Sequence, residues 1–548
     1  MAGKSLRKGL EVEISEKAPT HEVKRVGRID VSEIYGALKD ILAGRARTPM
    51  ILKDDRKGKT LVAYEIGKAR VRIGVDKGEG IYCVDEPPLT SREELLYAYT
   101  LQKLMYELKP EEAVMSVVDS KLREAEKALG LVGMVNIDNI KYYLNREVFG
   151  FGPIDVMVRD ERVEDIKCSG IDREVIVMHR EYGKLGWLKT NLKFDDEDYL
   201  ADFVRRLAHK GGRGISTAIP YVDCPLTGIK DEKGREIFIR FAGTIGREIT
   251  RYGSTFVIRK FPAEPFSLAQ LVRSGMLSSL MAAYLWFVAE NKRIFFVAGP
   301  TGSGKTTLLN AILGVLDPKL SYITIEDVFE LHLPAWRWIP MTTRRSWAIV
   351  ESRYEIKIED LIAMAMRMRP DYLIVGEVRT AEQLIALLLS ATTGHGAMTS
   401  IHAQDPESLL VRLLTMKIER SALDLLWGCA ITQPVKIEEG LGIKRRVVKI
   451  AEFVYNPGQD AADIATVFTW MPGEDRFIPE DVDELWEVSS RLKILSETLK
   501  LDREEIRKNI EEKRLFIEAN LETRFKELSD KSSMLYAGQI SERWVKVG

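Results

Sequence analysis

Hydrophobic and polar positions change their spacing several times along the chain, which predicts a series of modules rather than one domain. Short runs rich in β-branched residues alternate with Gly, Asp and Lys turns over about residues 21–86, which predicts a small β-rich domain. A helical pattern with a capping-type start follows over about residues 90–149. Residues 154–260 then combine strand patterns with a helix over about 199–210, which is typical of an α+β domain.

The second half of the chain begins with the order of elements that a parallel-sheet protein shows. A helical pattern over 268–290 precedes an apolar strand at 294–298, a glycine-rich turn and another helix. The pattern runs to about Tyr455 and ends in a hairpin-like pair around 440–442. We expect a catalytic domain here, followed by a connector beyond Gly458.

Residues 480–528 form a further helical region. Apolar residues recur there at spacings of three and four on one helical face: Leu485, Val488, Leu492, Leu495 and Leu499. Such a stripe is either a coiled-coil seam for a partner or the inner face of an appendage. Because sustained heptads are missing, we interpret it as a helical appendage that packs on its own domain.

These patterns divide the chain into five expected segments. They are an N-terminal extension with a small β-rich domain (1–89), a helical module (90–150), an α+β domain (151–262), a catalytic α/β domain (263–457) and a connector with a helical appendage (458–548). A chain of 548 residues is long enough for several such modules.

Composition adds limits on the partners. Hydrophobic residues make up 45% and charged residues 30% of the chain, which suits several cores with a strongly charged surface. The 81 basic and 82 acidic residues leave a net charge of -1, so no global field favours nucleic acid or anionic lipid. We therefore expect no nucleic acid partner.

The N-terminus and the cysteines indicate a cytosolic protein. The first 20 residues carry charges throughout and lack the apolar core of a secretory signal. The apolar stretch 280–289 is about half of the ~20 residues that cross a bilayer, so we expect no membrane span. The four cysteines are far apart and form no C-x-x-C pair, so we expect neither zinc nor disulfides.

The glycine-rich turn is a complete P-loop. Its glycines let backbone N–H groups surround a phosphate, Lys305 reaches the β- and γ-phosphates, and the Thr306 hydroxyl is placed to ligate Mg²⁺. We expect ATP rather than GTP, because Asn291-Lys292-Arg293 lacks the Asp of a guanine-reading motif. The expected nucleotide contacts are Gly299, Pro300, Thr301, Gly302, Ser303, Gly304, Lys305, Thr306 and Thr307.

Carboxylates follow two further predicted strands. Glu326 ends the run 320–325, with Glu330 one turn later, and Glu377 ends the run 371–376. The carboxyl ends of parallel strands meet at one edge of a sheet, where the γ-phosphate and Mg²⁺ of a P-loop protein lie. One of these acids can orient the attacking water, and Glu377 can also hold Mg²⁺ through water or polarise the nucleophile.

Histidines and arginines complete the candidate site. His395 and His402 flank a predicted strand of the same sheet, where an imidazole can hydrogen-bond the γ-phosphate or sense its loss. Arginines crowd the end of the α+β domain and include candidates for fingers that neutralise transition-state charge: Arg235, Arg240, Arg247, Arg251 and Arg259. Strand-face solubility explains two or three of them equally well. Arg367, Arg369 and Arg379 are a second basic set with the same two interpretations.

In this order, the motifs GPTGSGKTT, TIEDVFEL, MRMRPDYLIVGEVRTAEQ and TTGHGAMTSIHA resemble those of the type II/type IV secretion ATPases, the traffic ATPases that serve secretion and pilus assembly. Stretches before them, at 150–155, 177–183, 215–220 and 254–261, are similar to the N-terminal domain of that family's archaeal branch. The resemblance covers roughly 150–455. It implies a RecA-like P-loop ATPase core behind a PAS-like α+β domain.

The resemblance also implies roles for single residues. Lys305 and Thr306 would bind phosphate and Mg²⁺, Glu326 would be the general base, and Glu377 the Walker B acid and a metal-side residue. His395 and His402 would form the His box, and Arg240 is the first finger candidate, with Arg235, Arg247 and Arg251 behind it. Two departures stand out: Thr380 replaces the usual Asp or Gly, and the four-cysteine metal module is missing.

Three functions compete at this point. The leading one is an ATP-driven cytoplasmic motor, hexameric like similar proteins and bound peripherally to the inner face of the membrane through a polytopic platform protein. Such a motor would act on pilin-like or secreted proteins indirectly. A nucleic-acid translocase or DNA-transfer motor shares the same core. A nucleotide-gated scaffold is disfavoured, because Lys305, Thr306, Glu326 and Glu377 are all present.

Overall fold

The computed structural model describes residues 58–107, 115–230, 234–262, 264–344, 355–392, 394–435, 442–456, 458, 461–499 and 502–547. The chain forms two compact units. One contains the described residues of Pro88–Val148, and the other contains those of Pro49–Pro87 and Phe149–Gly548. The part of the expected 1–89 module that precedes residue 58 lies outside the described residues.

The first unit is helical, as its sequence pattern predicts. It consists of α2 (Ser91–Glu107), α3 (Met115–Ala128) and α4 (Ile137–Val148). Leu96, Leu122 and Ile140 are among the buried residues of its core. Glu93 accepts hydrogen bonds from the backbone N–H groups of Thr90 at 2.7 Å and Asn136 at 2.7 Å, so it caps α2 and ties that cap to the start of α4.

The second unit contains two nine-stranded sheets. The first sheet has the order β1 (Lys59–Ile66), β2 (Ala69–Asp76), β3 (Glu79–Asp85), β6 (Leu188–Lys193), β5 (Glu174–His179), β4 (Val163–Cys168), β9 (Thr255–Lys260), β8 (Glu236–Thr244) and β7 (Tyr221–Lys230). It is antiparallel except where β3 meets β6. Helices α5 (Asp155–Arg159) and α6 (Glu197–Lys210) accompany these strands.

The first sheet differs from the expectation of a separate β-rich domain, since β1–β3 extend the sheet of the α+β domain. Buried polar contacts explain why β1–β3 and the strands of the α+β domain form one sheet. The buried Asp160 carboxylate accepts hydrogen bonds from the hydroxyls of Tyr64 at 2.6 Å and Tyr82 at 2.9 Å. Asn191 pairs with both backbone groups of Val84 at 2.9 Å. Because these buried groups would be costly without partners, they fix the two sets of strands together. The expected domain boundaries themselves stay predictions.

The second sheet is the α/β core. Its order is β12 (Trp338–Thr342), β11 (Tyr322–Glu326), β13 (Tyr372–Glu377), β14 (Gly396–Ile401), β10 (Ile294–Ala298), β15 (Leu426–Val435), β16 (Lys444–Asn456), β17 (Ala461–Met471) and β18 (Arg476–Ile478). The strands from β12 to β15 in this order are parallel, and β16–β18 continue antiparallel. This is the sheet of a RecA-like core preceded by an α+β domain.

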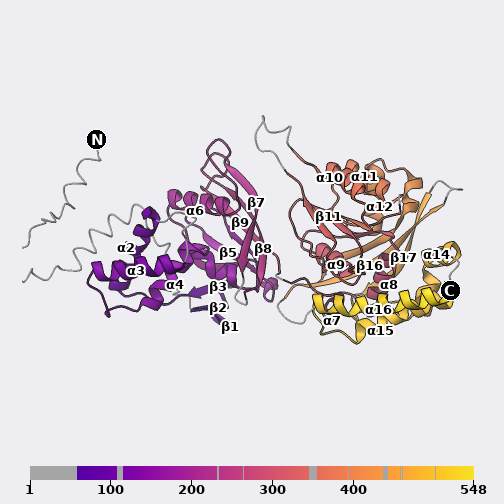
Figure 1. Ribbon diagram of the computed structural model, residues 1–548, viewed down its shortest axis with the longest axis horizontal. Helices are drawn as coiled ribbons and strands as arrows, with labels where there is room; N and C mark the ends of the chain where they lie inside the picture. The colour runs from indigo at the N-terminus through magenta and orange to yellow at the C-terminus, as the bar shows by residue number, and fades with distance from the viewer. Residues whose placement is uncertain are drawn as a thin grey trace, which may run out of the picture. The chain divides into compact units, whose positions relative to one another are not determined.

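Helices cover both faces of this sheet (Figure 1). One face carries α7 (Leu268–Arg273), α8 (Ser279–Glu290), α9 (Lys305–Leu313) and the C-terminal helices α13 (Val482–Val488), α14 (Ser490–Leu499), α15 (Arg503–Glu518) and α16 (Phe525–Val547). The other carries α10 (Ile358–Ala365), α11 (Ala381–Ala391) and α12 (Pro406–Thr415). In β10, Phe295 and Val297 face the first layer while Phe296 and Ala298 face the second, so the apolar run is buried on both sides.

Three local differences from the sequence prediction have clear causes. The helix expected over 268–290 divides into α7 and α8, because Gly275 has φ 73° and Ser278 caps a new helix through the Met281 N–H. The connector expected beyond Gly458 contains β17 and β18, which extend the sheet. The turn of the expected hairpin near 440 lies partly outside the described residues, but its two strands, β15 and β16, are paired.

The C-terminal helices pack on their own domain, as the interpretation of the leucine stripe expects for three of its five residues. Leu485, Leu492 and Leu495 belong to the buried core, whereas Val488 at the end of α13 is exposed, and the stripe divides between α13 and α14. The Trp286 indole N–H donates to the Tyr536 hydroxyl at 2.6 Å, which joins α8 to α16. Among the helices in the described part of the chain, none combines the length and apolar character of a bilayer span.

Candidate nucleotide-binding site

The candidate site lies at one edge of the second sheet, where four parallel strands end. The P-loop follows β10, Glu326 is the last residue of β11, Glu377 is the last of β13, and His402 follows β14. Since these strands are neighbours in the sheet, their ends bring residues distant in sequence to the same place. The sequence prediction of a carboxylate-rich edge beside the P-loop is therefore realised in the fold.

The P-loop leads directly into α9, whose first turn contains Lys305, Thr306 and Thr307. Gly304 precedes the helix with φ 95°, a backbone conformation that side chains other than glycine rarely adopt. Helix N-termini of this kind attract anions, because their first N–H groups lack partners within the helix. The local sequence thus creates a phosphate-binding turn.

Lys305 lies at this turn and is buried, with 8% of its surface exposed. Its Nζ donates to the Pro300 carbonyl at 3.1 Å and lies 3.4 Å from Nδ1 of His402. Burial lowers the pKa of Lys305, and the carboxylates of Glu377 and Glu330 only partly offset this. The charged form of a buried ammonium is stabilised when a negatively charged phosphate group binds nearby.

Two contacts to the P-loop come from strands that sequence reasoning did not connect with it. The Ser303 and Thr432 hydroxyls lie 2.8 Å apart, and Nε of Arg445 donates to the Gly302 carbonyl at 2.7 Å. Thr432 lies on β15 and Arg445 on β16. Only the pairing of these strands beside β10 places them there, so no local motif could have identified them.

Glu326 is the most deeply buried carboxyl of the site, with 4% of its surface exposed. Its Oε1 accepts hydrogen bonds from the backbone N–H groups of Glu330 at 3.0 Å and Leu331 at 3.1 Å. Its Oε2 is buried without a hydrogen-bond partner. Burial raises the pKa of Glu326 to about 8, so the carboxyl holds a proton at neutral pH.

Gly376 makes room for Glu326. A Cβ added at Gly376 would lie 2.9 Å from Cγ of Glu326, which is closer than carbon atoms tolerate. Gly376 stands where many Walker B strands carry Asp, so the glycine and the position of Glu326 are coupled. The sequence alone could not reveal this coupling, since the two residues lie on neighbouring strands, β13 and β11.

Glu377 lies at the centre of a charged network. Its Oε1 contacts Nε2 of His402 at 2.7 Å, and its Oε2 accepts from Nε of Arg379 at 2.8 Å. Nη1 of Arg379 in turn pairs with Asp327 at 2.8 Å. His402 also lies 3.2 Å from the Gly299 carbonyl through Nδ1. The network links the ends of three strands to the P-loop, and Arg379 joins it as a residue whose role the sequence left open.

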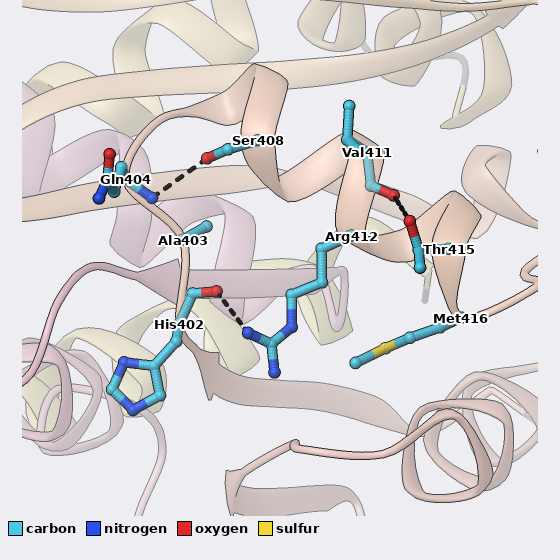
Figure 2. A pocket seen from close by; sticks show the side chains of 8 residues that line it. All are labelled: His402, Ala403, Gln404, Ser408, Val411, Arg412, Thr415 and Met416. Atoms are coloured by element: carbon cyan, nitrogen blue, oxygen red, sulfur yellow. Dashed lines mark hydrogen bonds between the residues drawn. The ribbon is translucent and has the colours of Figure 1, made fainter.

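His402 also borders an open pocket of about 470 Å³ (Figure 2). Nη1 of Arg412, on α12, donates to the His402 carbonyl at 3.1 Å, and the imidazole ring points away from Arg412. Asp405 caps α12 through the Ser408 N–H at 2.6 Å. The backbone at His402 is therefore held by α12, while its ring contacts Glu377 and the P-loop.

Glu330 lies between the P-loop and the arginines of the first sheet. Burial raises its pKa, while a hydrogen bond from the Thr306 hydroxyl and the positive charges of Arg259 and Arg240 partly offset this effect. The oxygen atoms of Thr306, Glu330 and Glu377 are the ligand types that Mg²⁺ prefers, directly or through water. The donor set at this edge thus fits a magnesium ion beside bound phosphates.

Arg240 and Arg259 are direct cross-strand neighbours on β8 and β9. Each is held by an aspartate. Arg240 forms two hydrogen bonds with Asp223, at 3.0 and 2.6 Å, and Arg259 forms two with Asp165, at 2.8 and 3.3 Å. These bonds raise the pKa of each guanidinium. Like charges directly opposite each other repel, so the two aspartates stabilise the pair.

His395, Arg235 and Arg251 make their contacts away from this edge. His395 precedes β14, so it lies at the opposite end of the strand from His402, near Asp371 at the start of β13. The structure thus separates the two histidines that the sequence placed together. Arg235 pairs with Glu161 at 2.5 Å, and Arg251 lies 5.8 Å from the ring centre of Tyr252. Neither contact involves the P-loop.

This chain is similar to known secretion and conjugal transfer proteins. A family model described as "Type II/IV secretion system protein" matches residues 246–437. An uncharacterized protein of Methanocaldococcus jannaschii is 32% identical over 74% of this chain and 76% of its own length. A putative conjugal transfer protein of Mycobacterium tuberculosis is 31% identical over 56% of this chain and 86% of its own length. A type II secretion system protein of Pseudomonas aeruginosa is 31% identical over 34% of this chain and 37% of its own length.

Proposed function

Because this chain belongs to the type II/IV secretion system protein family, an ATPase family, we propose that it is a motor that couples ATP hydrolysis to protein secretion or to assembly of a pilus-like filament. The observation that carries the proposal is the convergence of the P-loop, Glu326, Glu377 and His402 at one edge of the parallel sheet. Each of these groups has a distinct task in phosphoryl transfer to water.

Binding begins at the P-loop. Lys305 and the first N–H groups of α9 would hold the phosphates, and the Thr306 hydroxyl and Glu377 would hold Mg²⁺, Glu377 through water. Bound Mg²⁺ would neutralise charge on the transferring phosphoryl group. The pairing of Glu377 with Arg379 and His402 fixes its carboxylate, so that little reorganisation is needed when nucleotide arrives.

Glu326 acts as the general base in this proposal. Its Oε1 is occupied by two backbone N–H groups, which leaves Oε2 to accept a proton from water. A carboxyl with a pKa of about 8 must first lose its own proton. We therefore expect the rate of hydrolysis to rise with pH up to about 8, since only the ionised form can act as a base.

The first sheet supplies the arginines. Arg240 is bound by Asp223, and Arg259 is bound by Asp165. Besides these hydrogen bonds, the charge of Glu330 helps to raise the pKa of both arginines. In the proposed cycle they exchange an aspartate for the developing negative charge of the phosphoryl group. This exchange would couple the state of the nucleotide to movement of the α+β domain, which is how such a motor would produce force.

The finer features of the motor belong to the same proposal. We propose a homohexamer that binds ATP and Mg²⁺, sits peripherally at the inner face of the cell membrane and acts through a polytopic membrane platform protein. Pilin-like or secreted proteins would be moved indirectly, through that platform. Zinc and nucleic acid have no part in this mechanism.

One observation favours a second candidate function. The similarity to a putative conjugal transfer protein of Mycobacterium tuberculosis extends over 86% of that protein. A DNA-transfer motor would use the same P-loop, acids and arginines. We therefore keep nucleic-acid translocation as the alternative.

A stimulation assay separates the two candidates. ATP hydrolysis by the full chain is measured with vesicles of the host lipids and, separately, with single-stranded DNA. Stimulation by vesicles alone supports the secretion motor, whereas strong stimulation by DNA alone makes the translocase the better function. The double variant Glu326→Gln/Glu377→Gln is the control, and steady hydrolysis by this variant would refute the catalytic assignment itself.

A further inference from the structure

A second polar cavity lies at the edge of the core sheet opposite the P-loop. Its volume is about 300 Å³, and it is lined by the start of β10, the end of the 3-10 turn η6 (Arg420–Leu425), Trp427 and α14. β10 runs from Ile294, at this cavity, to Ala298, at the P-loop. The cavity is therefore separated from the nucleotide site by the length of a strand.

The charged groups that line the cavity do not balance. They are three cations, Lys292, Arg293 and Arg491, and one carboxylate, Asp424. Lys292 is paired with Asp371 at 2.9 Å outside this set, and Arg491 is paired with Asp424 at 3.1 Å. Arg491 also donates to the backbone carbonyls of Phe453 at 2.7 Å and Leu426 at 3.0 Å. One positive charge, that of Arg293, is left over.

Arg293 has no carboxylate within ion-pair distance among the described residues. Its Nε is buried and has no hydrogen-bond acceptor. Its guanidinium lies 6.0 Å from the ring centre of Trp427, which offers only a weak contact. Burial and the charge of Arg491 both lower the pKa of Arg293, which is the expected sign for a cation that lacks a counter-ion.

A half-buried guanidinium without an acceptor costs free energy, and an anion in the adjoining cavity removes that cost. The cavity is about ten times the ~30 Å³ that a water molecule occupies, so it has room for more than solvent. The planar fork of an arginine matches the oxygens of a phosphate group, so the unpaired guanidinium of Arg293 is the group that attracts it.

We propose that this cavity, the Arg293 pocket, binds a small phosphate-bearing molecule. Arg293 is the primary contact, and Arg491 keeps its pairing with Asp424 and its backbone partners. The ligand would join the first residue before the P-loop strand to α14 of the C-terminal appendage. Occupancy of the pocket would therefore tighten the packing of the appendage on the ATPase core.

Inorganic phosphate is the probe for the test, and the Lys305→Ala background weakens its binding at the P-loop. Calorimetric titration of phosphate is compared between the full chain carrying Lys305→Ala and the same chain carrying also Arg293→Met. We expect roughly tenfold weaker binding in the double variant, because one charge-assisted fork is lost. Lys508→Met, which removes an exposed charge on α15, is the matched control and is expected to change the affinity less than about twofold.

A conservative variant, thermal unfolding and competition with acetate complete the test of the Arg293 pocket. Arg293→Lys retains the charge without the fork, so its affinity is expected to lie between those of the two chains, even if Arg293→Met disturbs folding. Thermal unfolding with phosphate should show a rise in Tm that Arg293→Met removes. Equal phosphate affinity with and without Arg293 overturns the proposal. If acetate binds as tightly as phosphate and competes with it, the ligand is a carboxylate and the assignment to phosphate is wrong.

Discussion

The two edges of the core sheet are built on the same strands but treat charge differently. At the edge where the parallel strands end, Lys305 and Glu326 are buried and Glu330 is half-buried, and the pKa values of all three are shifted toward the neutral form. At the edge where the strands begin, Lys292 and Asp371 pair directly at 2.9 Å. Among the described residues, the buried groups at the first edge lack ion pairs within the site, whereas Lys292 and Asp371 satisfy each other at the second edge. Of the cations that line the Arg293 pocket there, Arg293 alone has no carboxylate partner among the described residues.

In a parallel sheet, ligand chemistry is favoured at the carboxyl ends of the strands. Loops at the carboxyl ends open away from the strands and can present side chains to a ligand. Residues before the strands are more often used to close the turn from the preceding helix. Buried charged groups without partners destabilise the fold, so they are retained where they serve a ligand.

The largest contrast between the edges should come from their two lysines. We expect Lys305→Ala to reduce ATP hydrolysis by about 100-fold or more, because the phosphates lose their only buried cation from the P-loop. Lys292→Ala, at the other edge, should leave the rate within about twofold. Phosphate release at saturating ATP measures both. Comparable losses in the two variants would contradict the division between the edges.

Glu326→Gln should come next in size. Removal of a general base costs on the order of 10²–10⁴ in rate, and the amide keeps the shape that Gly376 accommodates. ATP binding should persist, as measured with a fluorescent nucleotide. In the native chain, kcat should rise between about pH 6 and pH 8, following the raised pKa of Glu326. A flat profile over that range would argue against Glu326 as the base.

The two histidines provide a matched test within one strand. His402→Ala removes a contact to Glu377 at 2.7 Å, and we expect a loss of about tenfold in kcat. His395→Ala, at the start of the same strand, should change kcat by less than about twofold. Equal effects, or a larger effect from His395, would mean that the distance between the edges does not separate their roles.

The smallest effects concern stability and should have opposite signs at the two edges. Because folding raises the pKa of Glu326, its contribution to stability is present below about pH 4.5 and is lost as the pH rises through 8. Glu326→Gln should therefore increase the free energy of unfolding at pH 8.5, by about 1–3 kcal/mol, and by less at pH 5. Thermal unfolding at both pH values measures this difference.

Asp371 is the control of opposite sign. Burial works against its ionised form, but hydrogen bonds from the Ser321 N–H and from Lys292 hold the pKa of Asp371 below its usual range. Its contribution to stability is present above the unfolded pKa and is lost as the pH falls through the lower folded pKa. Asp371→Asn should thus lower Tm at pH 8.5, where Glu326→Gln raises it. A change in Tm of the same sign for both variants would contradict the expected difference between the two edges.

Sequence reasoning succeeded where one segment contains all the information. The P-loop needs only a strand, a turn of glycines and a helix, and these are contiguous from Ile294 to Leu313. The buried run of β10 and the carboxylates that end β11 and β13 follow from hydrophobic periodicity in the same way. The helical region 90–149 and the burial of Leu485, Leu492 and Leu495 were also predicted correctly, whereas Val488 of the same stripe is exposed.

Sequence reasoning failed where strand pairing decides position. His395 and His402 are close in the sequence, but an extended strand carries them to opposite edges. Arg445 reaches Gly302 only because β15 pairs with β10 and β16 pairs with β15. The strands β17 and β18 were expected to be a connector, since their exposed positions weaken the apolar pattern.

Local spacing is enough to define strands, helices and the phosphate turn, so the P-loop ATPase core and the acids at the ends of its parallel strands can be read from the sequence. Which acid is buried, which arginines are restrained and which histidine contacts Lys305 depends on the folded chain. The reason is that burial and pairing depend on neighbours across the sheet. The pKa of Glu326 is raised because neighbouring elements bury it. A glycine is required at position 376 because β13 lies beside β11, which places Glu326 against it.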